Sequence, residues 1–168
     1  VSMDNTALFQ RIRDTRDSLQ AILDGMEDGI LMINSDKIIT IANPPITMLG
    51  LNPDDLIEQS IFDLLENPSG DLLRRLGFTN QQAMMQVLDH LNNSNSWRNQ
   101  LTFEYALSAP DGTRTYIKRL LIPVRNDDDQ SASGILMVFY NKTEEHQLAQ
   151  ARDSLSQMIV HDLRSPLT

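Results

Sequence analysis

The order in which extended and helical segments follow one another constrains the fold of this chain most strongly. Two short β-branched runs, residues 30–34 and 37–42, come first and are joined by Ser35 and Asp36, as in a hairpin. Several short helical stretches follow, and three extended segments close the domain. This order excludes a doubly wound sheet, which needs regular alternation of strand and helix. It predicts an α+β domain with a five-stranded antiparallel sheet and short helices on one face.

The middle of the chain carries the start and stop signals of short helices. Asn52 is placed to cap a helix that has Pro53 in its first turn. Two further helical pieces, residues 71–76 and 80–91, are separated at Gly77. We therefore expect the helices to be short and broken, lying between the second and third strands.

The last three strands differ in how much of each should be buried. Residues 100–107 alternate apolar and polar, which predicts a strand with one buried face. A turn at Asp111 and Gly112 leads into residues 113–124. Residues 135–140 are apolar on both faces, so we expect a central strand with side chains packed on both sides.

Amphipathic helices are expected at both ends of the chain. In residues 1–27 the apolar positions follow at alternating spacings of about four and three, broken once by a threonine; they are Leu8, Ile12, Thr15, Leu19, Ile22 and Met26. Residues 144–168 carry a second stripe, which consists of Leu148, Ala151, Leu155 and Met158 and continues through Ile159, Leu163 and Leu167. The first stripe favours a contact in a parallel dimer over packing on the chain's own domain.

Composition narrows the function classes. The net charge is −9, with 23 acidic and 14 scattered basic residues, which argues against a nucleic-acid surface. Cysteine is absent, which excludes disulfides, thiolate metal sites, cysteine catalysis and a cysteinyl–flavin photoadduct, and fits a cytoplasmic location. The chain has no signal peptide and no apolar run of about 20 residues, although a membrane segment could precede residue 1.

The end of the chain combines a histidine, an adjacent acid and a proline. A neutral imidazole is a competent nucleophile at physiological pH, and phosphoryl transfer needs chiefly an in-line nucleophile and charge neutralisation. Asp162 could accept the Nδ1 proton of His161 and so leave Nε2 free to attack. Pro166 should loosen the helix one turn after the histidine. The alternative is an ordinary surface histidine on a helix that ends in proline.

Two resemblances follow from these motifs. The string from His161 to Leu167, HDLRSPL, closely resembles the phosphoacceptor box of sensor histidine kinases. Three short motifs resemble the PAS domain over about residues 27–143: GILMI from Gly29, IAN from Ile41, and MLG from Met48. In the PAS family an Asp-x-Thr triplet usually precedes the exit helix, whereas here the triplet begins with Asn141, which weakens the expected anchor of that helix.

The two resemblances together imply a domain plan. Residues 1–27 form an N-terminal signalling helix, residues 28–143 a PAS sensor domain, and residues 144–168 the exit helix and the start of the phosphoacceptor helix. We interpret the chain as part of a longer two-component histidine kinase, whose ATP- and Mg-binding domain lies elsewhere and without which the fragment should be inactive. The alternative is a non-catalytic PAS module for ligand binding or dimerisation.

The kinase resemblance also implies residue roles and partners. His161 would be the phosphoacceptor, Asp162 would orient the imidazole, and the hydroxyl of Ser165 could assist dephosphorylation of the response regulator. A homodimer, the response regulator and the downstream ATP-binding domain are the implied partners, and a small-molecule ligand is possible.

A PAS-like domain raises the question of a bound ligand. The candidate pocket walls, which could equally be ordinary core, are Ile41, Met48, Leu56, Phe62, Met84, Met85, Leu101, Phe103, Tyr105, Met137 and Phe139. A haem ligated by His90 is a less favoured alternative, because polar residues flank this histidine at a helix end. We assign no role to His146, expect no metal site, and interpret the acidic residues 127–129 as solvated charge.

Overall fold

The computed structural model describes residues 2–66, 71–93, 100–129 and 131–165. The strands are β1 (Gly29–Asn34), β2 (Ile39–Ala42), β3 (Leu101–Ser108), β4 (Arg114–Arg125) and β5 (Ala132–Asn141). The helices are α1 (Ser2–Gly25), the 3-10 helix η1 (Pro44–Leu49), α2 (Pro53–Leu56), α3 (Ile61–Glu66), α4 (Leu72–Arg75), α5 (Gln81–Asn93) and α6 (Thr143–Arg164).

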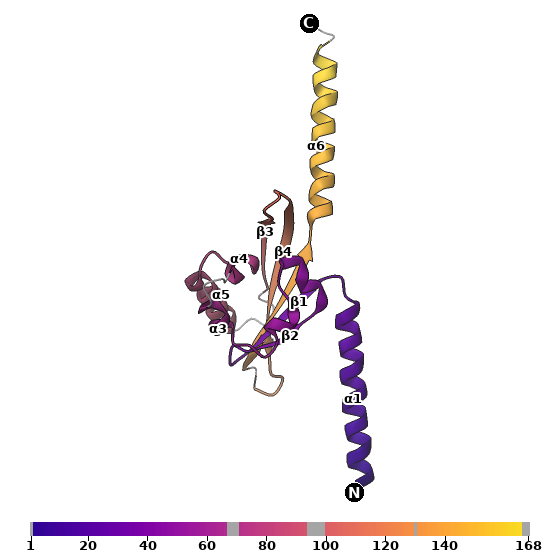
Figure 1. Ribbon diagram of the computed structural model, residues 1–168, viewed down its shortest axis with the longest axis vertical. Coiled ribbons are helices and arrows are strands. Elements are labelled where there is room, and N and C mark those ends of the chain that lie inside the picture. The colour runs from indigo at the N-terminus through magenta and orange to yellow at the C-terminus, as the bar shows by residue number, and fades with distance from the viewer. Residues whose placement is uncertain (1, 67–70, 94–99, 130, 166–168) are drawn as a thin grey trace.

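The five strands form one antiparallel sheet in the order β2-β1-β5-β4-β3. The first strand pairs with the last, from Gly29 opposite Phe139 to Asn34 opposite Gly134, so β5 is the central strand. The helices α3, α4 and α5 lie together on one side of the sheet (Figure 1). The predicted α+β architecture and the central position of the last strand are therefore confirmed.

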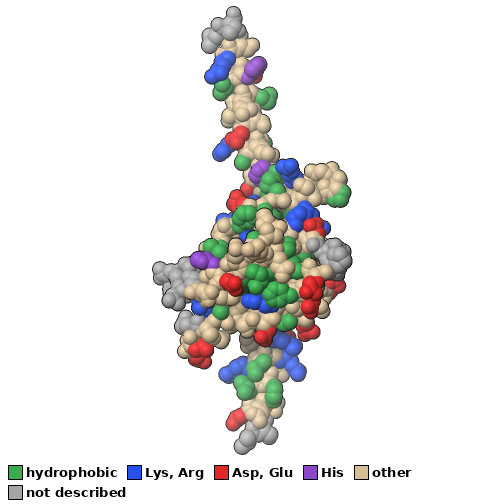
Figure 2. Space-filling view, turned by 90° about the vertical axis from the view of Figure 1, so that its left-hand side faces the viewer, with side chains coloured by type: hydrophobic (Ala, Val, Ile, Leu, Met, Phe, Trp, Pro, Cys, Tyr) green, Lys and Arg blue, Asp and Glu red, His purple; other side chains and the backbone are tan. Residues whose placement is uncertain are grey.

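The two long terminal helices project from the domain in opposite directions (Figure 1). Their hydrophobic side chains are open to solvent, as Figure 2 shows, with exposed fractions of 56% for Leu19 on α1 and 58% for Leu155 on α6. Neither helix carries an apolar stretch long enough to cross a bilayer, and the same holds for the other described helices. Each helix thus carries an apolar stripe that is exposed to solvent.

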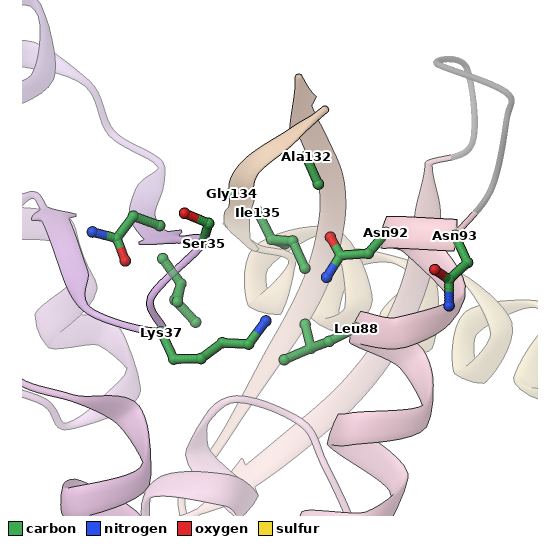
Figure 3. Close-up of a pocket in the computed structure, with 10 residues that line it drawn as sticks. Ser35, Lys37, Leu88, Asn92, Asn93, Ala132, Gly134 and Ile135 are labelled. Carbon is green, nitrogen blue, oxygen red and sulfur yellow. The ribbon is translucent and has the colours of Figure 1, made fainter. Parts of the chain in front are cut away.

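The β1–β2 turn is longer than the sequence predicts. The Oδ1 atom of Asn34 accepts hydrogen bonds from the N–H groups of Asp36 and Ile38, both at 3.0 Å. Lys37 between them has a φ of 66°, in the left-handed region, and its side chain extends beneath the turn (Figure 3). Because these turn contacts satisfy the backbone, β2 begins only at Ile39.

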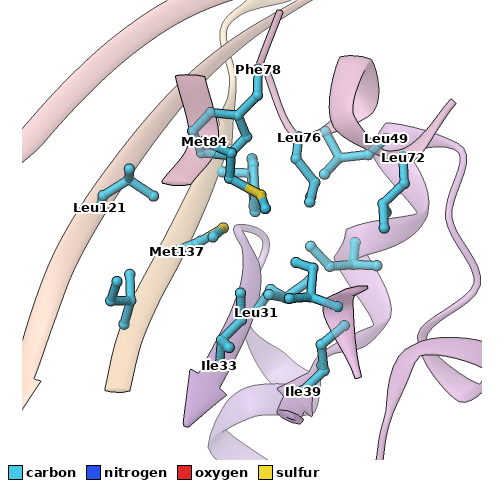
Figure 4. Close-up of a cluster of buried hydrophobic side chains, with 14 of the residues drawn as sticks. Leu31, Ile33, Ile39, Leu49, Leu72, Leu76, Phe78, Met84, Leu121 and Met137 are labelled. Carbon is cyan, nitrogen blue, oxygen red and sulfur yellow. The ribbon is translucent and has the colours of Figure 1, made fainter. Parts of the chain in front are cut away.

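The hydrophobic core lies between the sheet and the helices (Figure 4). Leu31 from β1, Leu121 from β4 and Met137 from β5 are fully buried, and they meet Leu76 and Met84 from the helical side. Burying one such side chain stabilises the fold by about 1.5–3 kcal/mol. The alternating inward positions of the strands therefore hold the sheet rigidly against the helices.

Candidate functional site

The junction between the domain and α6 joins the central strand directly to the terminal helix. The N–H of Tyr116 on β4 donates to Thr143 Oγ1 at 3.0 Å, and the N–H of Lys142 donates to the Tyr116 carbonyl at 2.7 Å. Asn141 Oδ1 accepts from both the N–H and the hydroxyl of Thr143, at 3.0 and 2.6 Å. The amide of Asn141 thus provides the acceptor oxygen that caps this turn, although it brings no charge.

An aromatic contact reinforces the junction. The imidazole of His146, in the first turn of α6, stacks on the Tyr116 ring with centroids 3.6 Å apart and planes inclined by 14°. Lys142 pairs with Glu145 at 3.0 Å beside it. Sequence reasoning assigned His146 no role, because nothing in the local pattern shows that the first turn of α6 packs on β4.

His161 lies near the far end of α6. Its Nδ1 atom is 3.7 Å from Asp162 Oδ1, and both side chains are more than 80% exposed. At 100° per residue, His161 lies about 120° around the helix from Leu155 and about 60° from Met158, at the side of the apolar stripe. Ser165 follows as the C-cap residue, and its N–H donates to the His161 carbonyl. The predicted effects of Pro166 and Leu167 lie outside the described residues.

A shallow hollow surrounds His161 on this face of α6. Its walls are Ser156, Gln157, Val160 and Arg164. Arg164 is three residues after the histidine and so lies on the same side of the helix. The arrangement places an imidazole, a carboxylate and a guanidinium together on an open surface.

Most of the predicted pocket residues form the core. Leu56, Met84, Met137 and Phe139 belong to the buried cluster, and the residues packed against its margin include Met48, Phe62, Met85, Leu101 and Tyr105. The candidate walls are therefore mutually packed side chains, which is the ordinary alternative that the sequence left open.

Two predicted pocket residues lie elsewhere. Ile41 pairs with Met32, whose neighbours Leu31 and Ile33 point into the core, so Ile41 faces the opposite side of the sheet. Phe103 has the inward register but is 49% exposed, because it lies on β3 at the edge of the sheet. The alternation of a strand shows its two faces, but not how far the helices extend over each face.

A buried arginine is the polar feature that sequence reasoning missed. Arg119 is 5% exposed, and its Nη1 atom donates to the carbonyls of Leu76 at 2.8 Å and Gly77 at 2.9 Å. Its guanidinium carbon lies 4.0 Å from the centroid of the Phe78 ring. Burial lowers the pKa of Arg119 to about 10. Its position between inward Ile117 and Leu121 in β4 was the available clue.

Tyr105 holds the same helix end as Arg119. Its hydroxyl donates to the Arg75 carbonyl at 2.7 Å, and burial raises the pKa of this phenol well above its usual range. Gly77 has a φ of 82°, and a Cβ atom there would lie 2.5 Å from the Tyr105 ring. Tyr105 and Arg119 therefore fasten the end of α4 to the sheet.

His90 lies on the exposed side of α5, away from the buried Leu88 and Leu91. The imidazole is thus placed outside the core to which an enclosed haem would bind. No three histidine, cysteine, aspartate or glutamate side chains come together as a metal site among the residues that the structure describes.

Comparison with known proteins agrees with this architecture. The family described as the PAS fold matches residues 17–142, well over half of the chain. The chain therefore belongs to the PAS fold family, a class of sensory domains. A search of curated proteins gave no match.

Solved structures resemble the fold at low sequence identity. The PAS domain of BvgS from Bordetella pertussis is 13% identical, with a TM-score of 0.55 over 86% of this chain and 98% of that one. A C-terminal domain from Streptococcus mutans is 16% identical, with a TM-score of 0.54 over 79% of this chain and 88% of that one. These similarities concern the fold alone.

Proposed function

We propose that this chain is the sensory and phosphoacceptor region of a two-component histidine kinase. The observation that carries the proposal is the placement of the His161–Asp162 pair, with Arg164 and Ser165 after it, on the solvent-exposed outer part of a helix that leaves the central PAS strand. A phosphoacceptor must be reached by two different macromolecular partners in turn. A histidine that is 82% exposed on a projecting helix meets this requirement.

The chemistry would use the residues around His161 in distinct roles. Asp162 would hold the Nδ1–H of the imidazole after a small rotation, because the present 3.7 Å is beyond hydrogen-bond distance. The Nε2 lone pair would attack the γ-phosphorus of ATP held by a separate domain, and the bond to the ADP oxygen would break. Arg164 would offset charge on the transferred group, with Mg²⁺ on the nucleotide.

The phosphoryl group would then pass from His161 to an aspartate of a response regulator. Ser165 lies one turn beyond the histidine, where its hydroxyl could orient a water for the reverse function, dephosphorylation of the regulator. Serine lacks the methyl group that restricts the rotamers of threonine, so we expect this activity to be weaker than with threonine.

The route from sensor to phosphoacceptor would run through the junction. Thr143, Asn141 and Tyr116 couple β4, β5 and the first turn of α6 by hydrogen bonds. A displacement of the sheet would therefore turn or tilt α6. The exposed stripes on α1 and α6 would be covered in a parallel homodimer, which also favours the second candidate function, a non-catalytic PAS dimerisation module.

Phosphorylation of the full-length protein separates these two functions. With ATP and Mg²⁺, the kinase proposal predicts acid-labile phosphate that is lost in His161→Gln. His90→Gln is the matched control, because that imidazole is equally a surface histidine but lies on α5, outside the junction and outside α6. Acid-labile phosphate that persists in His161→Gln, or that is absent from the wild type, would refute the assignment and favour the dimerisation module.

A further inference from the structure

A small cavity of about 330 Å³ lies between the β1–β2 turn, the C-terminal end of α5 and the start of β5 (Figure 3). This volume is at the lower end of the range for ligand sites, about 300–1,000 Å³. The cavity is separate from the α6 surface around His161. It also shares no lining residue with the pocket that the sequence predicted. The residues that line it are Ile33, Asn34, Ser35, Lys37, Leu88, Asn92, Asn93, Ala132, Gly134 and Ile135.

Lys37 brings a positive charge to this cavity. Its backbone is held by two hydrogen bonds, from its own N–H to the Asn34 carbonyl at 3.0 Å and from the Ile61 N–H to its carbonyl at 3.0 Å. Its side chain extends under the turn towards Leu88, as Figure 3 shows. Within the described ranges the Lys37 ammonium group has neither an ion pair nor a hydrogen bond.

Further polar side chains of the lining have no hydrogen-bond partner among the described residues. The side chains of Ser35, Asn92 and Asn93 form no hydrogen bond with another described residue. Figure 3 shows the Asn92 amide directed from α5 into the space opposite Lys37. No carboxylate occurs among the described lining residues. The cavity therefore offers one positive charge and several donors without a negative counterpart.

The end of α5 would normally oppose an anion, since the free carbonyls of a helix C-terminus carry partial negative charge. Here Arg125 from β4 forms hydrogen bonds with two of these carbonyls. Its Nη2 atom donates to the Leu91 carbonyl at 3.2 Å and to the Asn92 carbonyl at 3.3 Å. Arg125 thus offsets part of the negative charge of these carbonyls.

The floor of the cavity is apolar. Leu88 from α5, Ile33 from β1 and Ile135 from β5 are all at most 3% exposed. Gly134 lets the strands approach at this edge, because a Cβ atom there would lie 2.3 Å from the Ile33 carbonyl oxygen. An occupant that is charged at one end and hydrocarbon at the other matches both halves of the lining.

We propose that this cavity binds a small aliphatic carboxylate. The carboxylate would pair with Lys37 and accept hydrogen bonds from Ser35 and the Asn92 or Asn93 amide, while the hydrocarbon chain would lie on Leu88 and Ile135. Inorganic phosphate would satisfy the charge but leave the apolar floor without a partner. The bound ligand would touch the start of β5, the strand whose other end continues into α6.

Titration of the full chain with sodium hexanoate at constant ionic strength tests this site. Amide proton–nitrogen NMR spectra should show saturable shifts at Ser35, Leu88 and Gly134. Because hydrogen bonds to a charged group contribute about 1.5–3 kcal/mol, Lys37→Gln should weaken hexanoate binding by about tenfold or more. Lys118→Gln is the matched control, since Lys118 lies on β4 outside this cavity and should leave binding unchanged.

Hexan-1-ol and inorganic phosphate distinguish the two halves of the ligand, and each should bind more weakly than hexanoate. Four results would overturn the proposal. They are no saturable hexanoate binding up to about 10 mM, equal affinity in Lys37→Gln, equal loss in Lys118→Gln, and tighter binding of phosphate or hexan-1-ol than of hexanoate. The same NMR spectra report whether each variant is folded.

Discussion

Asn43 connects α1, β1 and β2 at one buried point, and its substitution tests how the N-terminal helix is attached. Asn43 is only 2% exposed. Its Oδ1 accepts from the Ile30 N–H at 2.6 Å, and its Nδ2 donates to the carbonyls of Asp28 at 2.9 Å and Leu23 at 3.2 Å. Three backbone groups thus depend on this one amide.

Asn43→Ala would leave all three backbone groups without their partner. An unsatisfied buried group costs about 1–3 kcal/mol, and the two carbonyls are only partly buried, so the total should be about 3 kcal/mol. For a chain of this length that loss lowers the melting temperature by about 6–12 °C. Asn34→Ala is the matched control, because its side chain bonds two N–H groups at an open turn and should cost about 1 kcal/mol.

Asn43→Asp adds a pH dependence of known sign. A carboxylate could still accept from Ile30 but would face the Asp28 and Leu23 carbonyls without a donor, so the folded state should raise its pKa. The folded protein would then hold a proton that the unfolded chain releases above about pH 4. Relative to wild type, stability should therefore fall as pH rises from there, by up to about 1.4 kcal/mol per pH unit until the raised pKa is reached.

Urea denaturation of the three variants between pH 4 and pH 7 measures these effects. A loss below about 1 kcal/mol for Asn43→Ala would refute the reasoning, because one unsatisfied buried N–H alone should exceed it. A pH-independent difference between Asn43→Asp and wild type would show that the site admits water.

Three further predictions concern other parts of the molecule. Replacing Leu19 and Ile22 together with Asp should shift the chain towards monomer, because a charged stripe cannot pack in a dimer; unchanged mass by light scattering at low micromolar concentration would contradict this. Arg119→Ala should lower the free energy of unfolding by about 3–5 kcal/mol and Arg119→Met by about half as much, because both variants remove the charge but only methionine refills the space; equal losses in urea would argue against a packing role. In the full-length kinase, Asp162→Asn should slow autophosphorylation, whereas Ser165→Ala should spare it and slow regulator dephosphorylation; wild-type dephosphorylation by Ser165→Ala would make Ser165 a structural residue.

The sheet architecture was predictable because period and segment order are local properties. A run that is apolar on both faces, such as residues 135–140, must lie inside a sheet, and the order of strands and helices excludes a doubly wound fold. The helix cap at Asn52 was equally local: its side chain accepts from the Asp54 N–H as the Asn-Pro signal indicates. The His161 motif could be noticed for the same reason, since it is a short run of adjacent residues.

Contacts between distant segments were decided only by the tertiary structure. The burial of Arg119 depends on Leu76 and Gly77, which lie more than forty residues away in sequence. The exposure of Phe103 depends on where the helical layer ends, and the cavity beside Lys37 on the meeting of a turn, a helix end and a strand. Side-chain periodicity determines which face a residue occupies, whereas burial and partners depend on what the rest of the chain brings to that face.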